Sequence, residues 1–254
     1  MSAAHYAPMA TSSVFLTGAS RGIGRALAVR LAARGLHVCL AARDQEALES
    51  VRAEIEAGGG EASVWPLDVS DPARVTEVMR AADDAREGIE LVVANAGVTV
   101  GRWSGKMTYD DIASVIDVNV RGATATLLAL LPAMVARGRG HLVGVSSLAR
   151  YRASPKMAAY SASKAYFSAF VEGLRLDLQR TQIAVTDIRP GFVETDLVQG
   201  MKRMPFLIGA EDAAARIDRA IQGRVRVAEF PLPMATLVRA ASNLPDALYE
   251  RAVR

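Results

Sequence analysis

Short apolar runs alternate with longer segments of helical periodicity along most of the chain. The nearly continuous apolar runs predict buried strands at Ser13–Thr17, Leu36–Ala41, Ala62–Leu67, Ile89–Ala94, His141–Ser146 and Ile183–Ile188. The segments between them predict helices at Arg25–Arg34, Gln45–Ala57, from Asp71-Pro72 onward, Tyr109–Ala136 and Ala158–Arg180. This alternation predicts an α/β fold, a doubly wound parallel sheet with helices on both faces. Such sheets bind their ligands beyond the carboxyl ends of the strands.

The composition is that of an ordinary globular protein, with 51% hydrophobic and 22% charged residues. Basic residues number 30 and acidic residues 27, and the two kinds are mostly interleaved. This pattern indicates a solvated surface and argues against a nucleic-acid partner. Cys39 is the one cysteine of the chain and sits within an apolar run. A disulfide framework within the chain is therefore excluded, and a reducing compartment is favoured.

No uninterrupted apolar stretch has the length of about 20 residues that a bilayer span needs. The best candidate, Ala123–Ala136, is shorter and contains Thr124, Thr126 and Pro132. Residues 1–13 show no basic region followed by an apolar block, so no signal peptide is evident. We expect no transmembrane span and a cytoplasmic location.

A glycine-rich turn, Thr17–Gly24, follows the first predicted strand and precedes an amphipathic helix. Glycines at such a turn let the backbone approach a pyrophosphate, and the helix N-terminus offers unpaired N–H groups to its charge. The spacing of Gly18, Gly22 and Gly24 is G-x3-G-x-G rather than the more general G-x-G-x-x-G. Methyltransferases and plain tight turns use similar loops, but the position in the chain favours dinucleotide binding.

The end of the second strand indicates which dinucleotide is bound. An acidic residue there would hydrogen-bond the ribose 2′-hydroxyl of NAD, whereas this chain has Ala41 and Ala42 followed by Arg43. An arginine pairs well with a 2′-phosphate, and Arg21 in the glycine-rich turn reaches the same region. The pair favours NADP(H), although Asp44 would weaken this preference. The alternative is that both arginines are exposed, solubilising residues.

Tyr160 and Lys164 are four residues apart, on one face of a predicted helix. A phenol with its usual pKa of about 10 is a poor base at neutral pH, and a nearby ammonium would lower that pKa. Ser147 lies thirteen residues before Tyr160, at the end of a strand, where it would hydrogen-bond a carbonyl or alkoxide oxygen. By itself, a tyrosine and lysine at this spacing is usually a helix-surface pair.

Taken in order, these motifs resemble the short-chain dehydrogenase/reductase family. The resemblance extends from about Val14 to Thr195 and implies a Rossmann-type fold and hydride transfer between a nicotinamide and a substrate carbon. The sequence TGASRGIG is similar to the family's cofactor loop and implies cofactor contacts from Gly18, Ser20, Arg21, Gly22, Ile23 and Gly24.

The resemblance implies further cofactor residues. Asp68 and Val69 match the pair that contacts adenine in the family. Asn95, Ala96 and Gly97 match the end of the fourth strand, although Ala94 replaces an asparagine that is usual in the family. The segment after the sixth strand is similar as well, and implies contacts on the nicotinamide side from Pro190, Gly191, Val193 and Thr195.

The catalytic positions of the family are matched by Asn119, Ser147, Tyr160 and Lys164. The resemblance implies that Tyr160 transfers the proton and that Ser147 positions and polarises the substrate oxygen. It implies that Lys164 binds the nicotinamide ribose and lowers the pKa of Tyr160, and that Asn119 holds a water joining Lys164 to solvent. Ser146 is a neighbouring candidate for the serine, but the interval to Tyr160 selects Ser147. The expected substrate is a carbonyl or secondary alcohol of apolar or acyl type.

The pattern loosens after Gly191, and we expect a single domain over residues 1–254 in which about 192–254 form a substrate lid and a C-terminal elaboration. Phe192–Ala210 is interpreted either as a mobile lid over an apolar substrate or as an amphipathic helix that closes the core; its side chains include Leu197, Met201, Lys202, Arg203, Met204, Phe206 and Leu207. The tail, with Val225–Pro233 and a final amphipathic stretch, would add a last strand, join subunits or make a peripheral membrane contact.

Two long helical segments, Arg121–Ala136 and Tyr160–Arg180, are apolar on more than one face. In the resembled family such helices pair across a two-fold axis, which implies a homodimer or homotetramer. Burial within one subunit is the competing explanation. Two other functions stay open: a catalytically idle NADPH-binding or scaffold protein, and an epimerase or dehydratase that uses the same cofactor. The complete set of four catalytic matches argues against the first, and the short chain argues against the second.

Overall fold

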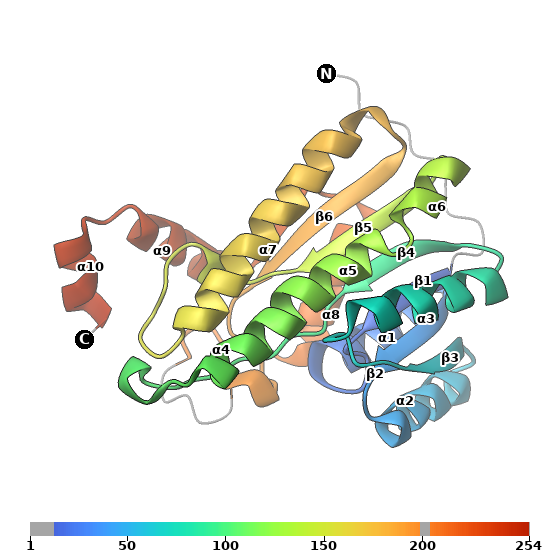
Figure 1. The fold of residues 1–254 in the computed structure, drawn as a ribbon, viewed down its shortest axis with the longest axis horizontal. Helices are drawn as coiled ribbons and strands as arrows, with labels where there is room; N and C mark the ends of the chain where they lie inside the picture. Colours follow the sequence, from blue (N-terminus) through green and yellow to red (C-terminus); the bar gives the residue numbers. More distant parts are fainter. Residues whose placement is uncertain (1–12, 199–203, 254) are drawn as a thin grey trace.

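The computed structural model describes residues 13–198 and 204–253, and its strands form one parallel sheet in the order β3-β2-β1-β4-β5-β6-β7 (Figure 1). The strands are β1 Ser13–Thr17, β2 His37–Ala42, β3 Glu61–Pro66, β4 Ile89–Ala94, β5 Gly140–Val145, β6 Ile183–Pro190 and β7 Val227–Phe230. The predicted doubly wound sheet is confirmed. The strand order reverses between β1 and β4, so the loops that follow these two strands diverge and leave a crevice at their carboxyl ends.

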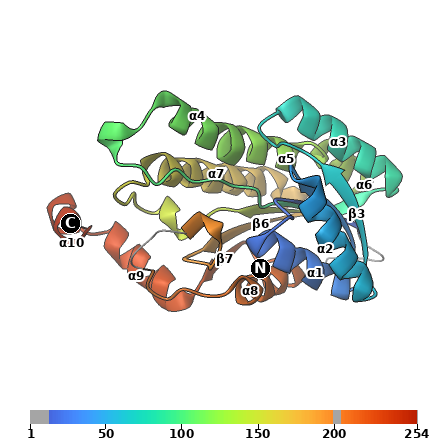
Figure 2. The ribbon, with the colours of Figure 1, turned by 90° about the horizontal axis from the view of Figure 1, so that it is seen from below.

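Helices cover both faces of the sheet (Figure 2). One face carries α1 Gly22–Ala33, α2 Gln45–Ala57 and α8 Ala210–Gln222. The other carries α3 Pro72–Ala85, α4 Tyr109–Ile116, α5 Ala123–Leu128, α6 Leu131–Arg137 and α7 Ala158–Asp177. Successive strand residues point to opposite faces, so Phe15 joins the core under α7 while Leu16 joins the core under α1.

Some element boundaries differ from the sequence prediction. Helix α1 begins at Gly22, inside the predicted turn and before Arg25. Glycine is a poor helix former, so the loop glycines concealed the first turn of this helix. Strands β2, β3 and β5 are displaced by one residue from their predicted positions, and β6 continues to Pro190.

The long helix predicted at Tyr109–Ala136 is interrupted. A π-helical turn at Asp117–Gly122 separates α4 from α5, and a break precedes α6. Among the described residues, the stretch Tyr109–Arg137 is the one helix long and apolar enough to cross a membrane by length and composition. The sequence estimate counted only the apolar run Ala123–Ala136, whereas the helical stretch also includes the residues before it. The expectation that no stretch is long and apolar enough for a span is therefore wrong on this criterion. Leu127 and Leu130 of this stretch are buried in the core, as in a helix that covers a sheet.

The tail supplies the last strand, β7, and then α9 Leu232–Ser242 and α10 Asp246–Val253, which extend beyond the sheet (Figure 1). Before α8, the described part of Phe192–Ala210 holds a 3₁₀ turn at Asp196–Val198 and a β-bridge between Val193 and Ile208, but no α-helix. The predicted lid residues Met201, Lys202 and Arg203 lie outside the described residues.

The carboxylate of Asp218 joins α8 to α1. The residue is 1% exposed and accepts hydrogen bonds from Arg30 Nε at 2.9 Å, from Gln222 Nε2 at 3.0 Å and from Arg34. Because hydrogen bonds to charged groups contribute about 1.5–3 kcal/mol each, we expect Asp218→Asn to lower the free energy of unfolding by about 2 kcal/mol. Urea denaturation measures this change.

Asp212 provides the matched control for that substitution on the same helix. Its partner is Arg216, and both side chains are more than a third exposed. Exposed ion pairs contribute about 0–1 kcal/mol. Asp212→Asn is therefore expected to leave the urea midpoint nearly unchanged, and equal losses in the two variants would contradict this account of Asp218.

Candidate active site

The four predicted catalytic residues converge beyond the carboxyl ends of β4 and β5. Asn119 lies in the π-helical turn, and Ser147 caps the 3₁₀ turn that follows β5. Tyr160 and Lys164 occupy the first two turns of α7. Gly97, from the loop after β4, joins them: a Cβ placed on Gly97 would lie 3.5 Å from Lys164 Nζ and 3.4 Å from Asn119 Oδ1.

Lys164 is 5% exposed, and its Nζ donates a hydrogen bond to the carbonyl oxygen of Val145 at 3.0 Å. The ammonium lies 5.7 Å from the centre of the Tyr160 ring. Burial lowers the pKa of Lys164 to about 8, and the Asp187 carboxylate partly opposes this shift. The side chain is thus held in place as a cation whose charge is lost just above neutral pH.

The Ser147 side chain lies beside the Tyr160 phenol and favours its ionised form. Burial raises the pKa of the Tyr160 phenol, and the neighbouring Ser147 offsets only part of the increase. The pKa of Tyr160 is therefore raised overall, and the expectation that Lys164 lowers it stays a prediction. The Lys164 ammonium is directed to the Val145 carbonyl, and desolvation of the phenol dominates.

The two serines after β5 have different partners. Ser146 Oγ donates to the backbone oxygen of Lys164 at 3.0 Å, which ties β5 to α7. Ser147 Oγ accepts from Ala149 N at 3.1 Å and lies 3.4 Å from the oxygen of Pro190. The hydroxyl next to Tyr160 is that of Ser147, the serine that the sequence interval selects.

The side-chain amide of Asn119 is occupied by protein groups. Its Oδ1 accepts from Val98 N at 2.8 Å, and its Nδ2 donates to Val98 O at 2.8 Å and to Ser163 Oγ at 3.0 Å. The residue is fully buried. Asn119 thereby fixes the loop after β4 against α7, beside Lys164. Its π-helical turn is an irregularity that is frequent at functional sites.

The glycine-rich loop has the shape required for a dinucleotide phosphate. Gly18 has a φ of +68°, and a Cβ there would approach Ala96 Cα to 2.9 Å. A Cβ on Gly24 would lie 1.9 Å from the Gly18 oxygen, so only glycine lets α1 pack this close to the loop. Arg21 precedes α1, and among the described residues no side chain caps this helix. The free N–H groups at its start fit a pyrophosphate.

Asn95 holds the glycine-rich loop against β4. Its Nδ2 donates to the oxygens of Thr17 and Gly18 at 3.0 and 3.3 Å. The backbone N–H groups of Asn95 and Ala96 donate to Thr17 Oγ1 at 3.1 and 3.2 Å. The side chain of Asn95 thus shapes the loop, although the sequence placed this residue among the cofactor contacts.

The residues predicted for the adenosine end lie at the ends of β2 and β3. Arg43 is exposed directly after β2, whereas Arg21 forms an ion pair with Asp196 at 2.9 Å. Asp44 caps α2 by accepting from Ala47 N at 3.0 Å. Beyond β3, Asp68 accepts from Ser70 N at 2.9 Å, and Val69 is 8% exposed.

The residues predicted for the nicotinamide side follow β6. Gly191 N donates to the oxygen of Phe230 at 2.8 Å, which fixes the turn after Pro190. Val193 is buried. Thr195 lies against the glycine-rich loop, since a Cβ on Gly22 would approach its Cγ2 to 3.0 Å. The segment after β6 therefore closes the site opposite α7.

Residues 12–205 match the family model described as short chain dehydrogenase. This chain belongs to the short-chain dehydrogenase family. It is 43% identical over 249 residues to an uncharacterized oxidoreductase of Myxococcus xanthus, covering 98% of each chain.

Solved structures of other family members superpose closely on this dehydrogenase. A short-chain dehydrogenase/reductase from Burkholderia phymatum in complex with NAD has a TM-score of 0.83 at 27% identity, covering 90% of this chain and 92% of that one. A short-chain dehydrogenase from Sphingobium yanoikuyae in complex with NADPH has a TM-score of 0.81 at 26% identity, covering 93% and 97%. The chain is thus a short-chain oxidoreductase whose structural neighbours bind nicotinamide dinucleotides.

The sequence analysis missed several residues that surround the site of this dehydrogenase. The Val145 carbonyl holds Lys164, and Ser163 holds Asn119. Asp187 and Arg189 are buried on β6. The sequence prediction ended this strand at Ile188 and gave neither residue a role. Two charged residues at alternate positions of an apolar run were the available signal.

Proposed function

We propose that this dehydrogenase is an NADP(H)-dependent oxidoreductase that interconverts a carbonyl compound and a secondary alcohol, with Tyr160 as the general acid and base. The observation that carries the proposal is the convergence of Ser147 and the buried Tyr160 phenol, with Lys164 one helical turn away. The glycine-rich loop and the uncapped start of α1 lie across the crevice from this pair and fit the phosphates of the cofactor.

Each residue has a separate task in carbonyl reduction. NADPH, when bound, supplies the hydride to the carbonyl carbon. Ser147 donates a hydrogen bond to the substrate oxygen and orients it toward Tyr160. Tyr160 donates its proton to that oxygen, so that hydride and proton together complete the alcohol. Lys164 stabilises the phenolate that remains, and the loop fixed by Asn119 keeps Lys164 in place.

The raised pKa of Tyr160 leaves the phenol in the form that carbonyl reduction uses. Burial raises this pKa, so the phenol carries its proton at neutral pH. A protonated phenol is the form that donates to a carbonyl oxygen. Alcohol oxidation would instead require a phenolate, which becomes accessible at higher pH.

The proposed substrate is of apolar or acyl type, and apolar side chains pack around Gly191, directly after β6. A Cβ on this residue would approach Met234 Cγ to 3.2 Å and Leu148 Cδ1 to 3.4 Å. Leu148 directly follows Ser147 and is 2% exposed. Met157 lies near Thr99, with its sulfur 3.8 Å from the Thr99 hydroxyl. Methionine side chains adapt to irregular apolar shapes, which fits an extended hydrocarbon substituent.

The absorbance of NADPH against a panel of ketones, aldehydes and 3-oxoacyl thioesters tests this proposal. We expect substrate-dependent loss of NADPH absorbance with at least one carbonyl class. Tight NADPH binding without turnover across the panel would favour a catalytically idle binding or scaffold protein. The convergence of Ser147, Tyr160 and Lys164 argues for the enzyme, because cofactor binding alone does not require all three.

We expect NADPH to be preferred over NADH for two reasons. Arg43 directly follows β2, and the Asp44 carboxylate caps α2 and is thereby engaged with the helix instead of with a ribose hydroxyl. Loss of one charge-assisted hydrogen bond to a 2′-phosphate costs about 1.5–3 kcal/mol, or about ten- to a hundredfold. Arg43→Ala should therefore lower kcat/KM for NADPH by that factor and leave the value for NADH unchanged.

Arg52→Ala on α2 is the matched control for cofactor preference, since Arg52 pairs with Glu49 and Glu56 on the helix surface. It should alter neither cofactor's kcat/KM. If NADH supports turnover as efficiently as NADPH, and Arg43→Ala changes neither value, the proposed preference is wrong.

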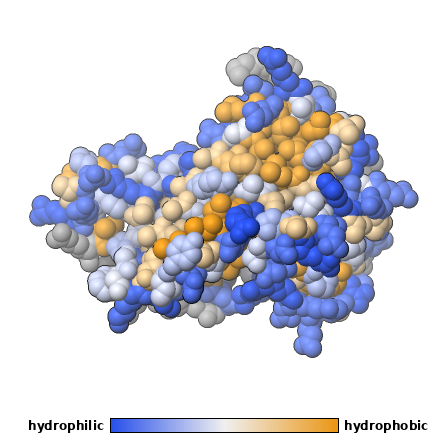
Figure 3. Space-filling model, in the orientation of Figure 1, coloured by the Kyte–Doolittle hydropathy of each residue, from blue (hydrophilic) through white to orange (hydrophobic). Residues whose placement is uncertain are grey.

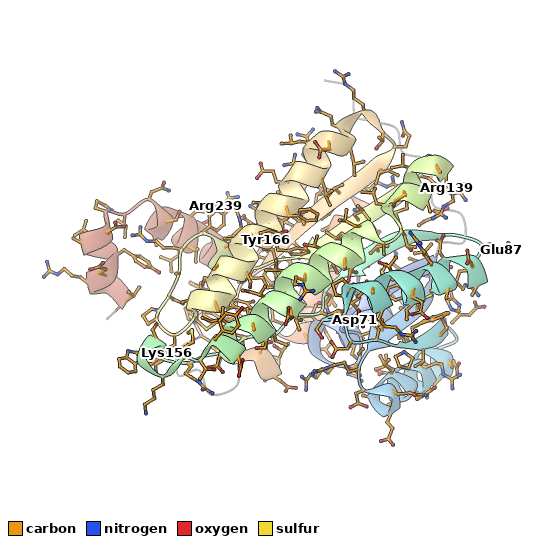
Figure 4. The ribbon with its side chains drawn as sticks, viewed as in Figure 1. Asp71, Glu87, Arg139, Lys156, Tyr166 and Arg239 are labelled. Atoms are coloured by element: carbon orange, nitrogen blue, oxygen red, sulfur yellow. The ribbon has the colours of Figure 1, made fainter. Side chains whose placement is uncertain are left out.

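A homodimer or homotetramer is expected from the apolar surface over α7 and the α5–α6 stretch (Figure 3). Tyr166 on α7 points outward and is 45% exposed, and Leu176 is 53% exposed (Figure 4). Leu128 and Val135 continue this surface on the neighbouring helices. We predict that sedimentation equilibrium gives a multiple of the 27.0 kDa chain mass, and that Leu176→Glu shifts the mass toward one chain. A monomeric wild-type protein would contradict this expectation.

A further inference from the structure

Two charged residues lie within β6, a strand that is buried along its whole length. Asp187 and Arg189 are 2% and 7% exposed and alternate with apolar neighbours. They share the strand face of Ile183 and Val185, which pack into the core under α7. Charges in such a position are costly to desolvate and must be held by partners.

Arg189 connects four structural elements. Its Nε donates to Asp187 Oδ2 at 2.7 Å and to Ser168 Oγ at 3.1 Å. Ser168 lies on α7, one turn beyond Lys164. The other end of the guanidinium donates to Tyr151 OH at 3.0 Å and to Glu229 Oε1 on β7 at 2.9 Å. One buried side chain thus links α7, β6, β7 and the segment that follows Ser147.

Tyr151 connects this cluster to Ser147, which lies four residues earlier along the same short segment. Its hydroxyl donates to Glu229 and accepts from Arg189 and from Arg239 Nε at 3.3 Å. Its ring is flanked by the guanidinium groups of Arg189 and Arg239, whose Cζ atoms lie 5.7 and 5.9 Å from the ring centre. Tyr151 is thereby fixed in both position and orientation.

The C-terminal helices hold the same segment from outside. Arg239 lies on α9 where this helix meets the body of the molecule (Figure 4), and it pairs with Glu229 at 2.7 Å. Arg152 donates to the oxygen of Leu244 at 2.7 Å and stacks over the Tyr249 ring at 4.1 Å. The Tyr249 hydroxyl donates to the oxygen of Ala153 at 2.8 Å. Residues 151–153 are therefore joined to α9 and α10.

Stability alone is a poor explanation for this cluster, because well-packed apolar residues of similar volume often replace buried ion pairs without loss. The cluster instead provides directional bonds beside the residues proposed to react. It joins the helix of Lys164, through Ser168, to the chain that carries Ser147. A shift of about 1 Å between reacting groups can lower a rate by about a hundredfold.

We propose that Tyr151, Arg189, Glu229 and Arg239 are positioning residues that fix Ser147 relative to Tyr160 and Lys164, so that α9 contributes to turnover without touching the reacting atoms. This inference rests on the proposed function, because it concerns the rate of the same reaction. Among the described residues, no hydrogen bond joins the cluster to the glycine-rich loop after β1, which would bind the cofactor phosphates on the other side of the crevice. The inference therefore separates turnover from cofactor binding.

Tyr151→Phe and Arg239→Ala test the inference. The first keeps the ring and removes the shared hydroxyl, and the second removes a side chain that is 57% exposed and whose loss leaves the core packed. We expect kcat per NADPH-binding site to fall about 10- to 100-fold in each variant, with the Kd of NADPH unchanged. Arg239→Lys, which keeps the charge near Glu229, should restore part of kcat.

Two controls distinguish positioning from general destabilisation. Tyr109→Phe removes a hydroxyl from a side chain that is 79% exposed and should leave kcat unchanged. Asp218→Asn weakens a buried ionic cluster on the opposite face of the sheet, and should lower stability while kcat per binding site is retained. Equal kcat per binding site in wild type, Tyr151→Phe and Arg239→Ala would overturn the inference.

Amide hydrogen exchange over residues 147–153 separates this inference from the proposed function. We expect faster exchange in Tyr151→Phe than in wild type. A wild-type protein that turns over no carbonyl would contradict the proposed function. Unchanged exchange over 147–153 in Tyr151→Phe would contradict the positioning role, whether or not turnover is found.

Discussion

Tyr160→Phe is expected to abolish nearly all turnover while NADPH binding is retained. The substitution keeps the ring beside Lys164, whose Nζ lies 5.7 Å from the ring centre, and removes the hydroxyl beside Ser147. Because positioned general acid–base catalysis contributes about 10²–10⁴-fold, kcat should fall by about that factor. The cofactor loop after β1 is untouched, so titration of NADPH fluorescence should give a Kd close to that of wild type.

Tyr166→Phe is the matched control on the same helix. Tyr166 points away from the site and stacks on Phe170, with the ring centres 6.2 Å apart (Figure 4). The Tyr166→Phe variant should keep the wild-type rate of turnover. Substantial residual activity in Tyr160→Phe would remove Tyr160 from the role of proton donor and would leave Ser147 or a solvent molecule to supply the proton.

Lys164→Met is expected to lower kcat by at least about a hundredfold, because it removes the cation that stabilises the phenolate. The pH profile provides a second, independent signature. Burial lowers the pKa of Lys164 to about 8, so the ammonium is present below this pH and is lost above it. The pKa of Tyr160 is raised, so the proton donor stays protonated over the same range. In wild type, the rate of reduction should therefore fall as the pH rises through about 8.

The Lys164→Met variant should lose this descending limb, since the ammonium to which it is assigned has been removed. Lys156→Met is the matched control: Lys156 is exposed in the loop before α7 (Figure 4), and its removal should preserve both the rate and the limb. A descending limb near pH 8 that persists in Lys164→Met would assign the titration to another group and contradict the role given to Lys164.

The sheet was predictable because parallel strands that are buried on both faces have nearly continuous apolar sequences. Strands β1 and β4 agree with the prediction at both ends. The start of α1 was missed because Gly22 and Gly24 are poor helix formers, yet the site needs them in the first turn. Local propensity and functional requirement disagree there, which is common at functional sites.

The convergence of the site could also be predicted, since ordered motifs at strand ends meet at one edge of a parallel sheet. The electrostatics of the site could not be predicted from the sequence. Spacing places Lys164 near Tyr160 but does not show that Val145 binds the ammonium or that burial raises the pKa of the phenol. Both depend on contacts between residues far apart in sequence.

The tail was the least predictable part. Its strand β7 is short, and its Glu229 interrupts the apolar pattern. The reason for that glutamate, a bond to Arg189, is visible only when β6 and β7 lie side by side. Arg152 likewise acquires a role only through α10, nearly a hundred positions later, where it meets Tyr249.

Isotope transfer tests the central claim most directly. Incubation of the wild-type dehydrogenase with NADPH deuterated at C4 and a carbonyl substrate from the panel should place deuterium on the carbinol carbon of the product, as detected by mass spectrometry. The Tyr160→Phe variant should form almost none of this product while binding the same cofactor. An alcohol product without deuterium from either face of the cofactor, or NADPH binding with no labelled product from any carbonyl class, would contradict the account.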